Sequence, residues 1–128
     1  MTHASGDGLI LRALRGATTA SANTAEAIHD AVEELVDALI ERNALAGDRV
    51  ISVTFTVTTD LNACFPAAAA RQRQGWDQVA LLDCQQMAVT GDLPHCIRLL
   101  AHAWLDPERQ PVHPYLRGAA RLRPDRAR

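Results

Sequence analysis

The sequence contains no lysine, and all thirteen of its basic residues are arginine. Arginine and lysine are nearly interchangeable only on solvated surfaces, so a coding bias toward arginine is a sufficient explanation there. With fifteen acidic residues, the formal net charge is -2 and the isoelectric point is about 6.2. This balance argues against a nucleic-acid-binding protein, whose surface would carry an excess of positive charge.

Cysteine is scarce, and its arrangement predicts neither disulfides nor a cysteine metal site. Cys64, Cys84 and Cys96 are an odd number and form no Cys-x-x-Cys pair, so we expect reduced thiols and a cytoplasmic protein.

No apolar stretch has the length of a signal peptide or a membrane span, so no membrane association is expected. The histidines are scattered over different predicted elements without metal-ligand spacing, and no metal site is predicted.

Familiar catalytic motifs are missing too: there is no Gly-x-Ser-x-Gly elbow, no glycine-rich phosphate loop and no His-Glu-x-x-His. What the sequence does have is Arg98 inside the apolar run 96–101, which leaves its guanidinium no obvious route to water. A buried arginine needs an anion. Because Arg15, Arg71 and Arg123 lie where predicted elements begin or end, the fold could gather several arginines around one small acidic molecule.

The bulk composition predicts one globular domain. A chain of 128 residues with 48% hydrophobic content is large enough to bury a real core. Residues 1–8 are small and polar and are predicted to form a flexible leader. The domain is expected over residues 9–125, followed by a short tail at 126–128.

One long amphipathic helix is predicted near the beginning of the chain. Asn23-Thr24-Ala25-Glu26 resembles a capping box with Asn23 as the N-cap. Acidic residues occupy the side of the helix opposite its apolar positions, which is typical of a surface helix that lies on a sheet. The apolar positions with the 3.6-residue period are Ile28, Val32, Leu35, Val36, Leu39 and Ile40.

Strand patterns surround this helix. Residues 9–14 are predicted to form a strand that ends at Arg15-Gly16, and residues 50–59 alternate apolar and hydroxyl side chains. Pro66 is expected in the first turn of a short helix over 65–71. The fold class predicted is α/β or α+β, with a mixed sheet covered by one long helix and by short helices. Further strands are predicted at 79–82, 97–104 and 115–122.

Six blocks of this sequence resemble the AroH-type, or type I, chorismate mutases in order and spacing. The resemblance covers about residues 9–125, and six blocks in sequence are far more specific than any one of them. The blocks are Leu14 to Thr19, Phe55 to Leu61, Phe65-Pro66-Ala67 with Arg71, Gly75-Trp76, Cys96-Ile97-Arg98, and Tyr115-Leu116 with Leu122 to Asp125.

The resemblance implies a homotrimer of barrel-like appearance, with one active site between each pair of neighbouring subunits and no cofactor. Its substrate would be chorismate, a small dianion that rearranges to prephenate in a single pericyclic step. Negative charge grows on the ether oxygen as the C–O bond breaks. Fixed cationic donors around a folded dianion are therefore the equipment that the reaction needs.

The resemblance also implies the roles of individual residues. Arg98 would donate to the ether oxygen, while Arg15 and Tyr115 would hold a carboxylate. Phe65 and Arg71 would come from the neighbouring subunit. Leu122 and Arg123 would close the site from the C-terminal end, and Leu81 and Leu82 would contact the substrate.

This chain departs from the family pattern at one wall of the expected site. Gln86 stands where relatives carry a glutamate that accepts the proton of the substrate hydroxyl, and Asp83 stands where they have a small residue or cysteine. Gln86 can still accept a hydrogen bond through its amide oxygen, and Asp83 is predicted to supply the charge that orients Arg98. Ala68 replaces a lysine of some relatives, which should weaken binding more than chemistry.

Two alternatives stay open because of Gln86. One is a catalytically weakened homologue that keeps the arginine cleft as a ligand-binding site. The other is a pericyclic enzyme that acts on a chorismate relative such as isochorismate, in specialised metabolism. Nucleic-acid binding by the arginine-rich end is a weaker reading, because the end has no interleaved aromatic residues beyond Tyr115.

Overall fold

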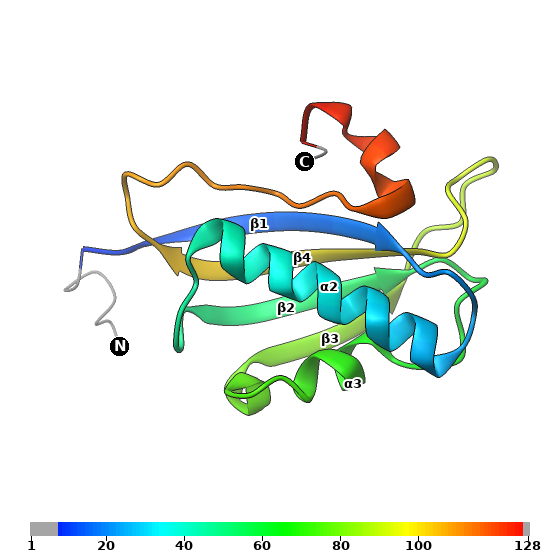
Figure 1. The fold of residues 1–128 in the computed structure, drawn as a ribbon, viewed down its shortest axis with the longest axis horizontal. Helices are drawn as coiled ribbons and strands as arrows, with labels where there is room; N and C mark the ends of the chain where they lie inside the picture. The colour runs from blue at the N-terminus through cyan, green and yellow to red at the C-terminus, as the bar shows by residue number, and fades with distance from the viewer. Residues whose placement is uncertain (1–7, 127–128) are drawn as a thin grey trace.

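The computed structural model describes residues 8–126 of the chain, so residues 1–7 of the predicted leader and residues 127–128 of the predicted tail lie outside the described residues. One four-stranded sheet is covered on one face by helices (Figure 1). The main elements are β1 (Ile10–Thr19), α2 (Ala25–Asn43), β2 (Val50–Val57), α3 (Pro66–Arg71), β3 (Ala80–Gln85) and β4 (Cys96–Leu105). Short 3-10 helices follow at η1 (Trp76–Gln78), η2 (Arg117–Leu122) and η3 (Pro124–Arg126).

The sheet is mixed, as predicted, with the strand order β1-β4-β2-β3. The strand β4 lies antiparallel to both β1 and β2, whereas β2 and β3 run parallel. A parallel pair needs a crossover connection, and here α3 and η1 supply it. This arrangement confirms the expectation of an α+β fold with one long helix.

The first strand is longer than predicted. It continues through Arg15 and Gly16 to Thr19, because β4 pairs with it along its whole length. A side chain at position 16 would meet the Pro114 carbonyl oxygen at 3.2 Å and Leu35 Cδ1 at 3.3 Å. Gly16 is therefore a site of close packing and not the strand end that its residue type suggested.

The N-cap of the long helix α2 is Thr24 and not Asn23. Thr24 Oγ1 accepts from the Ala27 amide at 3.1 Å, which is the N-cap bond. Asn23 instead accepts from the amides of Asn62 and Ala63, at 2.9 and 3.1 Å. The prediction of a helix here is confirmed, but the capping role lies one residue later because Asn23 ties the helix start to a distant turn.

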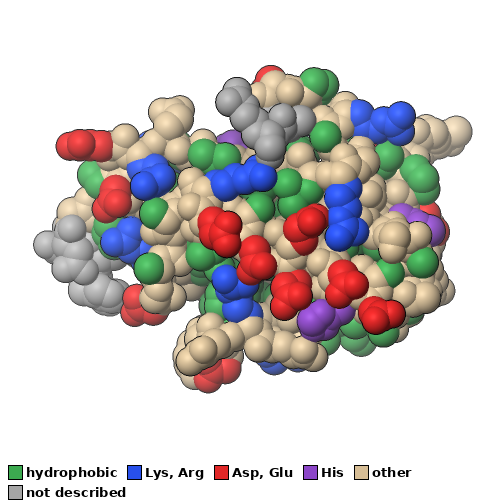
Figure 2. Space-filling model, in the orientation of Figure 1, with side chains coloured by type: hydrophobic (Ala, Val, Ile, Leu, Met, Phe, Trp, Pro, Cys, Tyr) green, Lys and Arg blue, Asp and Glu red, His purple; other side chains and the backbone are tan. Residues whose placement is uncertain are grey.

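The hydrophobic core lies between α2 and one face of the sheet. The predicted apolar stripe of α2 is buried, with Ile40 only partly buried against it. Figure 2 shows acidic side chains gathered over the outer side of the helix, as expected for a solvated face. Asn43 is the last residue of α2 and is 1% exposed. Its amide group bonds both the carbonyl and the N–H of Val112.

The opposite face of the sheet carries no helix of the described residues over most of its area. Along β4, Ile97, Leu99 and Ala101 point to the core, and the residues between them point to the other side. We call this side the open face. It carries exposed leucines, of which Leu82 is 59% and Leu100 is 42% exposed. Residues on the open face by register are Leu11, Arg15, Ser52, Thr54, Thr56, Leu82, Cys84, Arg98, Leu100, His102 and Trp104.

The second strand begins at Val50 as predicted, but it differs from its prediction at its end and at Ile51. It stops at Val57, two residues before the predicted end, where residues 58–61 form a turn. Ile51 is 39% exposed because the register against β4 shifts between Val50 and Ser52. The shift breaks the alternation that placed Ile51 in the core.

The predicted last strand, 115–122, is wrong. Tyr115 makes a single bridge with Ala17, and the chain then turns into η2. Arg117 adopts φ 52°, and the Gly118 amide donates to Thr19 Oγ1 at 3.2 Å. These bonds to the end of β1 redirect the chain away from the strand path. We refer to residues 111–116, which run beside β1, as the strap.

Asp60 holds the turn after β2 against the start of β4. It accepts from Thr58 Oγ1 at 2.5 Å and from the His95 amide at 3.0 Å. Burial alone would raise the pKa of Asp60, but the hydrogen bonds from Thr58 and His95 and the His95 charge together lower it. The ionised carboxylate is therefore the form that the folded protein favours.

Asp60→Asn is expected to lower the free energy of unfolding at neutral pH by at most about 1 kcal/mol, because the carboxylate is partly solvated. A group with a lowered folded pKa stabilises above its unfolded pKa of about 3.9, and this contribution is lost as the pH falls through the folded value. Urea unfolding of both proteins between pH 7 and pH 2 measures the effect. A gap between the two proteins that persisted unchanged at the lowest pH would contradict this assignment.

No helix within residues 8–126 has both the length and the apolar character required to cross a membrane.

Candidate active site

Arg98 lies on the open face, and its side chain is 39% exposed. The expectation of a guanidinium without a route to water is therefore wrong for the single chain, because the alternation of β4 turns Arg98 away from the core. The expectation of an anion is met: Arg98 Nη2 lies 3.4 Å from Asp92 Oδ1. Its Nε is buried and has no hydrogen-bond partner among the described residues.

Gln86 joins the same group from the end of β3. Its backbone amide donates to the Val57 carbonyl at 2.8 Å, which fixes where the side chain emerges. The side-chain Nε2 donates to Asp92 Oδ2. Gln86 Oε1 is buried without a partner among the residues that the structure describes. The trio Gln86, Asp92 and Arg98 therefore holds one free donor and one free acceptor at the same place.

Arg15 and Tyr115 border this trio on the β1 side. Arg15 pairs with Leu100 and Ala17 pairs with Arg98, so Arg15 is the diagonal neighbour of Arg98 on the open face. Tyr115 packs on Ala17 and is 8% exposed. Two of the predicted carboxylate-binding residues are thus placed near Arg98 by strand register and by the strap.

The C-terminal segment contributes Leu122 and Arg123. Leu122 is partly buried against the small cluster that contains Ala17 and Tyr115. Arg123 is paired with Asp125 at 2.9 Å. The hydrogen bonds that Arg123 donates to the Asp125 carboxylate raise the pKa of Arg123, and Tyr115 adds a smaller contribution in the same direction. Arg123 therefore remains fully charged at the border of the group.

A second group lies around Phe65, where the chain has left β2 and next to the last residues of β3. A hollow of about 390 Å³ is bordered there by Phe65, Pro66, Asp83 and the turn after β2. The Phe65 side chain is 71% exposed, which is unusual for a large aromatic residue. Arg71 ends α3 and is exposed as well. These residues form a wall that no other part of the described chain covers.

Asp83 belongs to this second group and not to the arginine group. It pairs with Phe55, which points into the core, so Asp83 lies on the helix-covered side of β3. Its Oδ1 accepts from the Ala67 amide at 2.9 Å, in the first turn of α3. The prediction that Asp83 orients Arg98 from the same wall is therefore wrong within one chain, since the two side chains leave opposite faces of the sheet.

The two predicted leucine contacts differ from each other. Leu81 is partly buried against the core, because its partner in the register is the buried Val53. This position does not favour a substrate contact. Leu82, one residue on, projects from the open face and is available.

Asp92 is the functional candidate that the sequence did not reveal. It lies in the loop 90–94, after Gly91, which has φ 82°. Nothing in the residue pattern distinguishes this aspartate from an ordinary loop acid. Only the folding of the loop back over β4 brings it to Arg98.

No side-chain hydrogen bond or ion pair within residues 8–126 joins Arg98 or Gln86 to Phe65, Arg71 or Asp83. We name the first group, with Arg15, Tyr115, Leu122 and Arg123, the arginine half-site. We name the second group the Phe65 half-site. One chain therefore presents two incomplete walls, each partly exposed.

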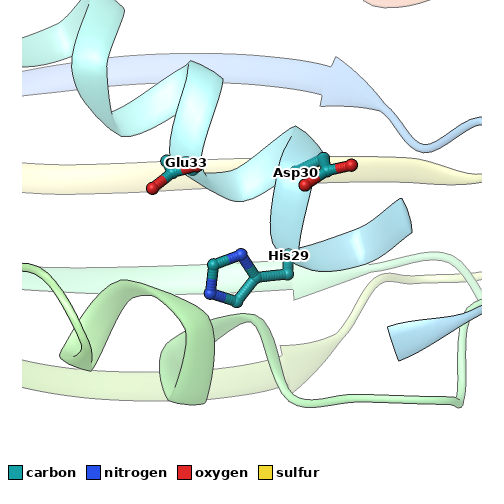
Figure 3. Close-up of side chains that lie close together, drawn as sticks. All are labelled: His29, Asp30 and Glu33. Atoms are coloured by element: carbon teal, nitrogen blue, oxygen red, sulfur yellow. The ribbon is translucent and has the colours of Figure 1, made fainter. Parts of the chain in front are cut away.

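Two further sets of reactive side chains remain, namely Cys96, which neighbours Arg98, and a trio on α2. Burial raises the pKa of the Cys96 thiol, which keeps it in the neutral form. A possible ion-binding trio of His29, Asp30 and Glu33 lies on α2 (Figure 3), with ligand atoms within 4.8 Å of one another. His29 points toward α3 and bonds Gln72 at 2.9 Å, while both acids are exposed. Exposed acidic groups are common without a bound ion, so we assign no metal to this trio.

Comparison with known proteins supplies the missing context. Residues 11–126 match the family described as chorismate mutase type I. The chain is 45% identical over 118 residues to chorismate mutase AroH of Thermus thermophilus, covering 91% of this chain and 96% of the relative. It is 38% identical over 118 residues to chorismate mutase AroH of Bacillus subtilis, covering 91% and 93%. A solved chorismate mutase from Clostridium thermocellum superposes with a TM-score of 0.77 at 42% identity, covering 84% of this chain and 96% of that one.

Proposed function

The chain belongs to the type I chorismate mutase family, and we propose that its arginine half-site and the Phe65 half-site of an adjoining copy together form the place where chorismate rearranges to prephenate. The activity is that of a chorismate mutase, an isomerase. The reaction breaks the ether C–O bond and forms a C–C bond within one molecule. It requires no nucleophile, which agrees with the missing catalytic motifs.

The free donor on Arg98 is the observation that carries the assignment of roles. As the ether bond breaks, negative charge grows on oxygen, and the partnerless Nε offers a fixed donor for it. The free Oε1 of Gln86 is an acceptor for the ring hydroxyl. Arg15 and Tyr115 hold a carboxylate of the substrate, and Arg123 with Leu122 closes the C-terminal border. No cofactor takes part in this scheme.

Assembly into a homotrimer completes each site in this proposal. Exposed leucines on the open face support it, because apolar patches of this kind favour contact with another protein surface. The large exposed area of Phe65 supports it too, since a ring wall of this size would be covered by an adjoining copy. The site would then lie between subunits and receive Phe65, Arg71 and Asp83 from one copy and Arg98 from the next.

The cellular setting is proposed from the thiols. Cys64, Cys84 and Cys96 are free, which suits the reducing cytoplasm. The role of the family at the branch toward phenylalanine and tyrosine would place the chain in aromatic amino-acid biosynthesis.

The direct test is turnover of chorismate by the purified chain. Loss of the diene absorbance together with formation of prephenate would support the proposal. A weakened homologue would bind chorismate without converting it, and an enzyme for a chorismate relative would convert isochorismate faster. Gln86 is the reason to include both arms, because it removes a carboxylate that relatives place at this position.

Asp83→Asn tests whether the Phe65 half-site supplies a working carboxylate. We expect kcat/KM to fall by roughly 10- to 100-fold, since a charged group that faces the bound dianion and its arginines is lost. The melting temperature should change little, because the Asn amide oxygen can still accept from the Ala67 amide. Steady-state kinetics and thermal unfolding separate the two effects. An Asp83→Asn enzyme as active as the unchanged chain would remove Asp83 from the site.

A further inference from the structure

We propose that Asp92 is a positioning residue, which sets the side chains of Gln86 and Arg98 and supplies the negative charge that Gln86 lacks. The proposal rests on the chorismate mutase function. It assigns a role to a loop residue that contacts the two groups facing the substrate. Asp92 itself would not contact the substrate.

The contacts of Asp92 use both of its oxygens. Oδ1 accepts from the Leu93 amide at 2.8 Å and from Arg98 Nη2 at 3.4 Å. Oδ2 accepts from Gln86 Nε2 at 2.5 Å. The side chain is 22% exposed, so these bonds are shielded from much of the solvent. The Asp92 amide donates to the Val89 carbonyl at 3.1 Å, which closes the loop that carries it.

Asp92 fixes the direction of the Gln86 amide. An ionised carboxylate only accepts hydrogen bonds, so the amide nitrogen of Gln86 has to face Asp92. The amide oxygen is then turned to the other side, where it is buried without a partner among residues 8–126. Without Asp92 the amide could present its nitrogen to the site, and a donor would stand where the reaction needs an acceptor.

Asp92 also fixes the guanidinium of Arg98. One Nη2 bond goes to Asp92, and Nε is left buried with no hydrogen-bond partner in the described part of the chain. A buried donor and a buried acceptor without partners are costly, and a ligand with an ether oxygen and a hydroxyl would satisfy both. The free groups therefore match the two polar atoms of chorismate that lie nearest the reacting bond.

The charge balance gives the second part of the proposal. A glutamate at position 86 would place a carboxylate beside Arg98, but Gln86 is neutral. Asp92 restores one negative charge beside that guanidinium, from a neighbouring loop. The chain therefore keeps a carboxylate paired with Arg98, although this carboxylate comes from position 92 and not from position 86.

Asp92→Asn is the first variant of the test, with Asp48→Asn, an exposed loop aspartate, as the matched control. We expect Asp92→Asn to lower kcat by roughly 10- to 100-fold, the scale of a small misplacement of reacting groups. KM should rise less, because Arg15 and Tyr115 still hold the substrate. The Asn oxygen can still accept from Leu93, so thermal unfolding should show a folded protein. The control should match the unchanged chain.

Gln86→Glu in the Asp92→Asn background is the decisive variant, because it returns the carboxylate to position 86. We expect it to recover most of the lost kcat, a rescue that a purely structural role for Asp92 would not give. Gln86→Glu alone places two carboxylates together, which raises the pKa of one of them. Its kcat should therefore depend on pH in a way that the double variant does not show.

Three results would each overturn the proposal: an Asp92→Asn enzyme within about threefold of the unchanged chain, a double variant no better than Asp92→Asn, or pH profiles that coincide. A failure of the function itself looks different. In that case the unchanged chain would not convert chorismate at all, and none of the variants would show turnover either.

Discussion

Arg98→Ala lowers kcat/KM for chorismate by at least about 10²- to 10³-fold, which is the largest effect we expect from a single substitution. Removal of one preorganised donor to a developing oxyanion costs about 3 kcal/mol at the transition state. Arg98 also neutralises Asp92, so its loss leaves a partly buried carboxylate without its counter-charge. The loss should fall mainly on kcat, because ether-oxygen charge develops only as the bond breaks. Following the diene absorbance with both proteins side by side measures it.

Two further substitutions sharpen this result. Arg98→Lys keeps the positive charge but loses the planar fork and the Nε donor, so it should remain far below the unchanged chain. Arg12→Ala removes an exposed arginine from β1 and serves as the matched control, with activity retained. Arg98→Ala activity within tenfold of the unchanged chain would remove Arg98 from the chemistry.

Mixed assemblies give the second large effect. Arg98→Ala disables the arginine half-site, and the combined change Phe65→Ala with Arg71→Ala disables the other. Each variant alone should be nearly inactive. When the two are unfolded together and refolded, about a quarter of the sites should combine two intact halves, because each half comes from an independently drawn subunit. Activity should therefore rise from near zero toward that fraction of the unchanged protein.

The control is the same mixture kept folded and assayed at once, before subunits exchange, and its activity should stay low. Size measurement of the refolded mixture should show the proposed trimer. Sites contained within one chain would give no recovery after refolding, whatever the ratio of the two variants. That outcome would contradict the shared site while leaving the Arg98 result untouched.

Patterns with a strong period predicted their part of the fold correctly. The stripe of α2 is buried as expected, since a 3.6-residue repeat fixes which side meets the core. Pro66 starts α3 as expected because a proline lacks only an N–H that is free in the first turn. Such features depend on neighbours along the chain and can be recognised without the fold.

Features that depend on distant partners could not be predicted in this way. Gly16 suggested a strand end, but its backbone is paired with β4, and glycine is needed there for close packing. The strand pattern at 115–122 failed because Arg117 and Gly118 bond to Thr19, about a hundred residues earlier. The residues around 115–122 give no indication of those contacts.

The candidate site shows the same division. Arg98 was identified because an arginine in an apolar run is unusual, and the register places Arg15 beside it. The prediction that Asp83 shares a wall with Arg98 failed within a single chain, because the register of β3 against β2 turns Asp83 to the helix-covered face. Asp92 gave no signal, because a loop acid acquires its meaning only when the loop folds over β4.

The strap connects the packed core of the protein to Tyr115, which we propose to bind the substrate. It is bonded to β1 through Ala17, whose amide donates to Pro114 at 3.0 Å and whose carbonyl accepts from Leu116 at 2.9 Å. Gly16 lets both Pro114 of this segment and Leu35 of α2 lie close to β1, and Tyr115 is carried between the two bonds. A larger side chain at position 16, or a change at Leu35, would therefore displace the Tyr115 phenol, which we propose to hold a carboxylate of the substrate. Changes in core packing next to this segment and changes in substrate affinity are therefore coupled.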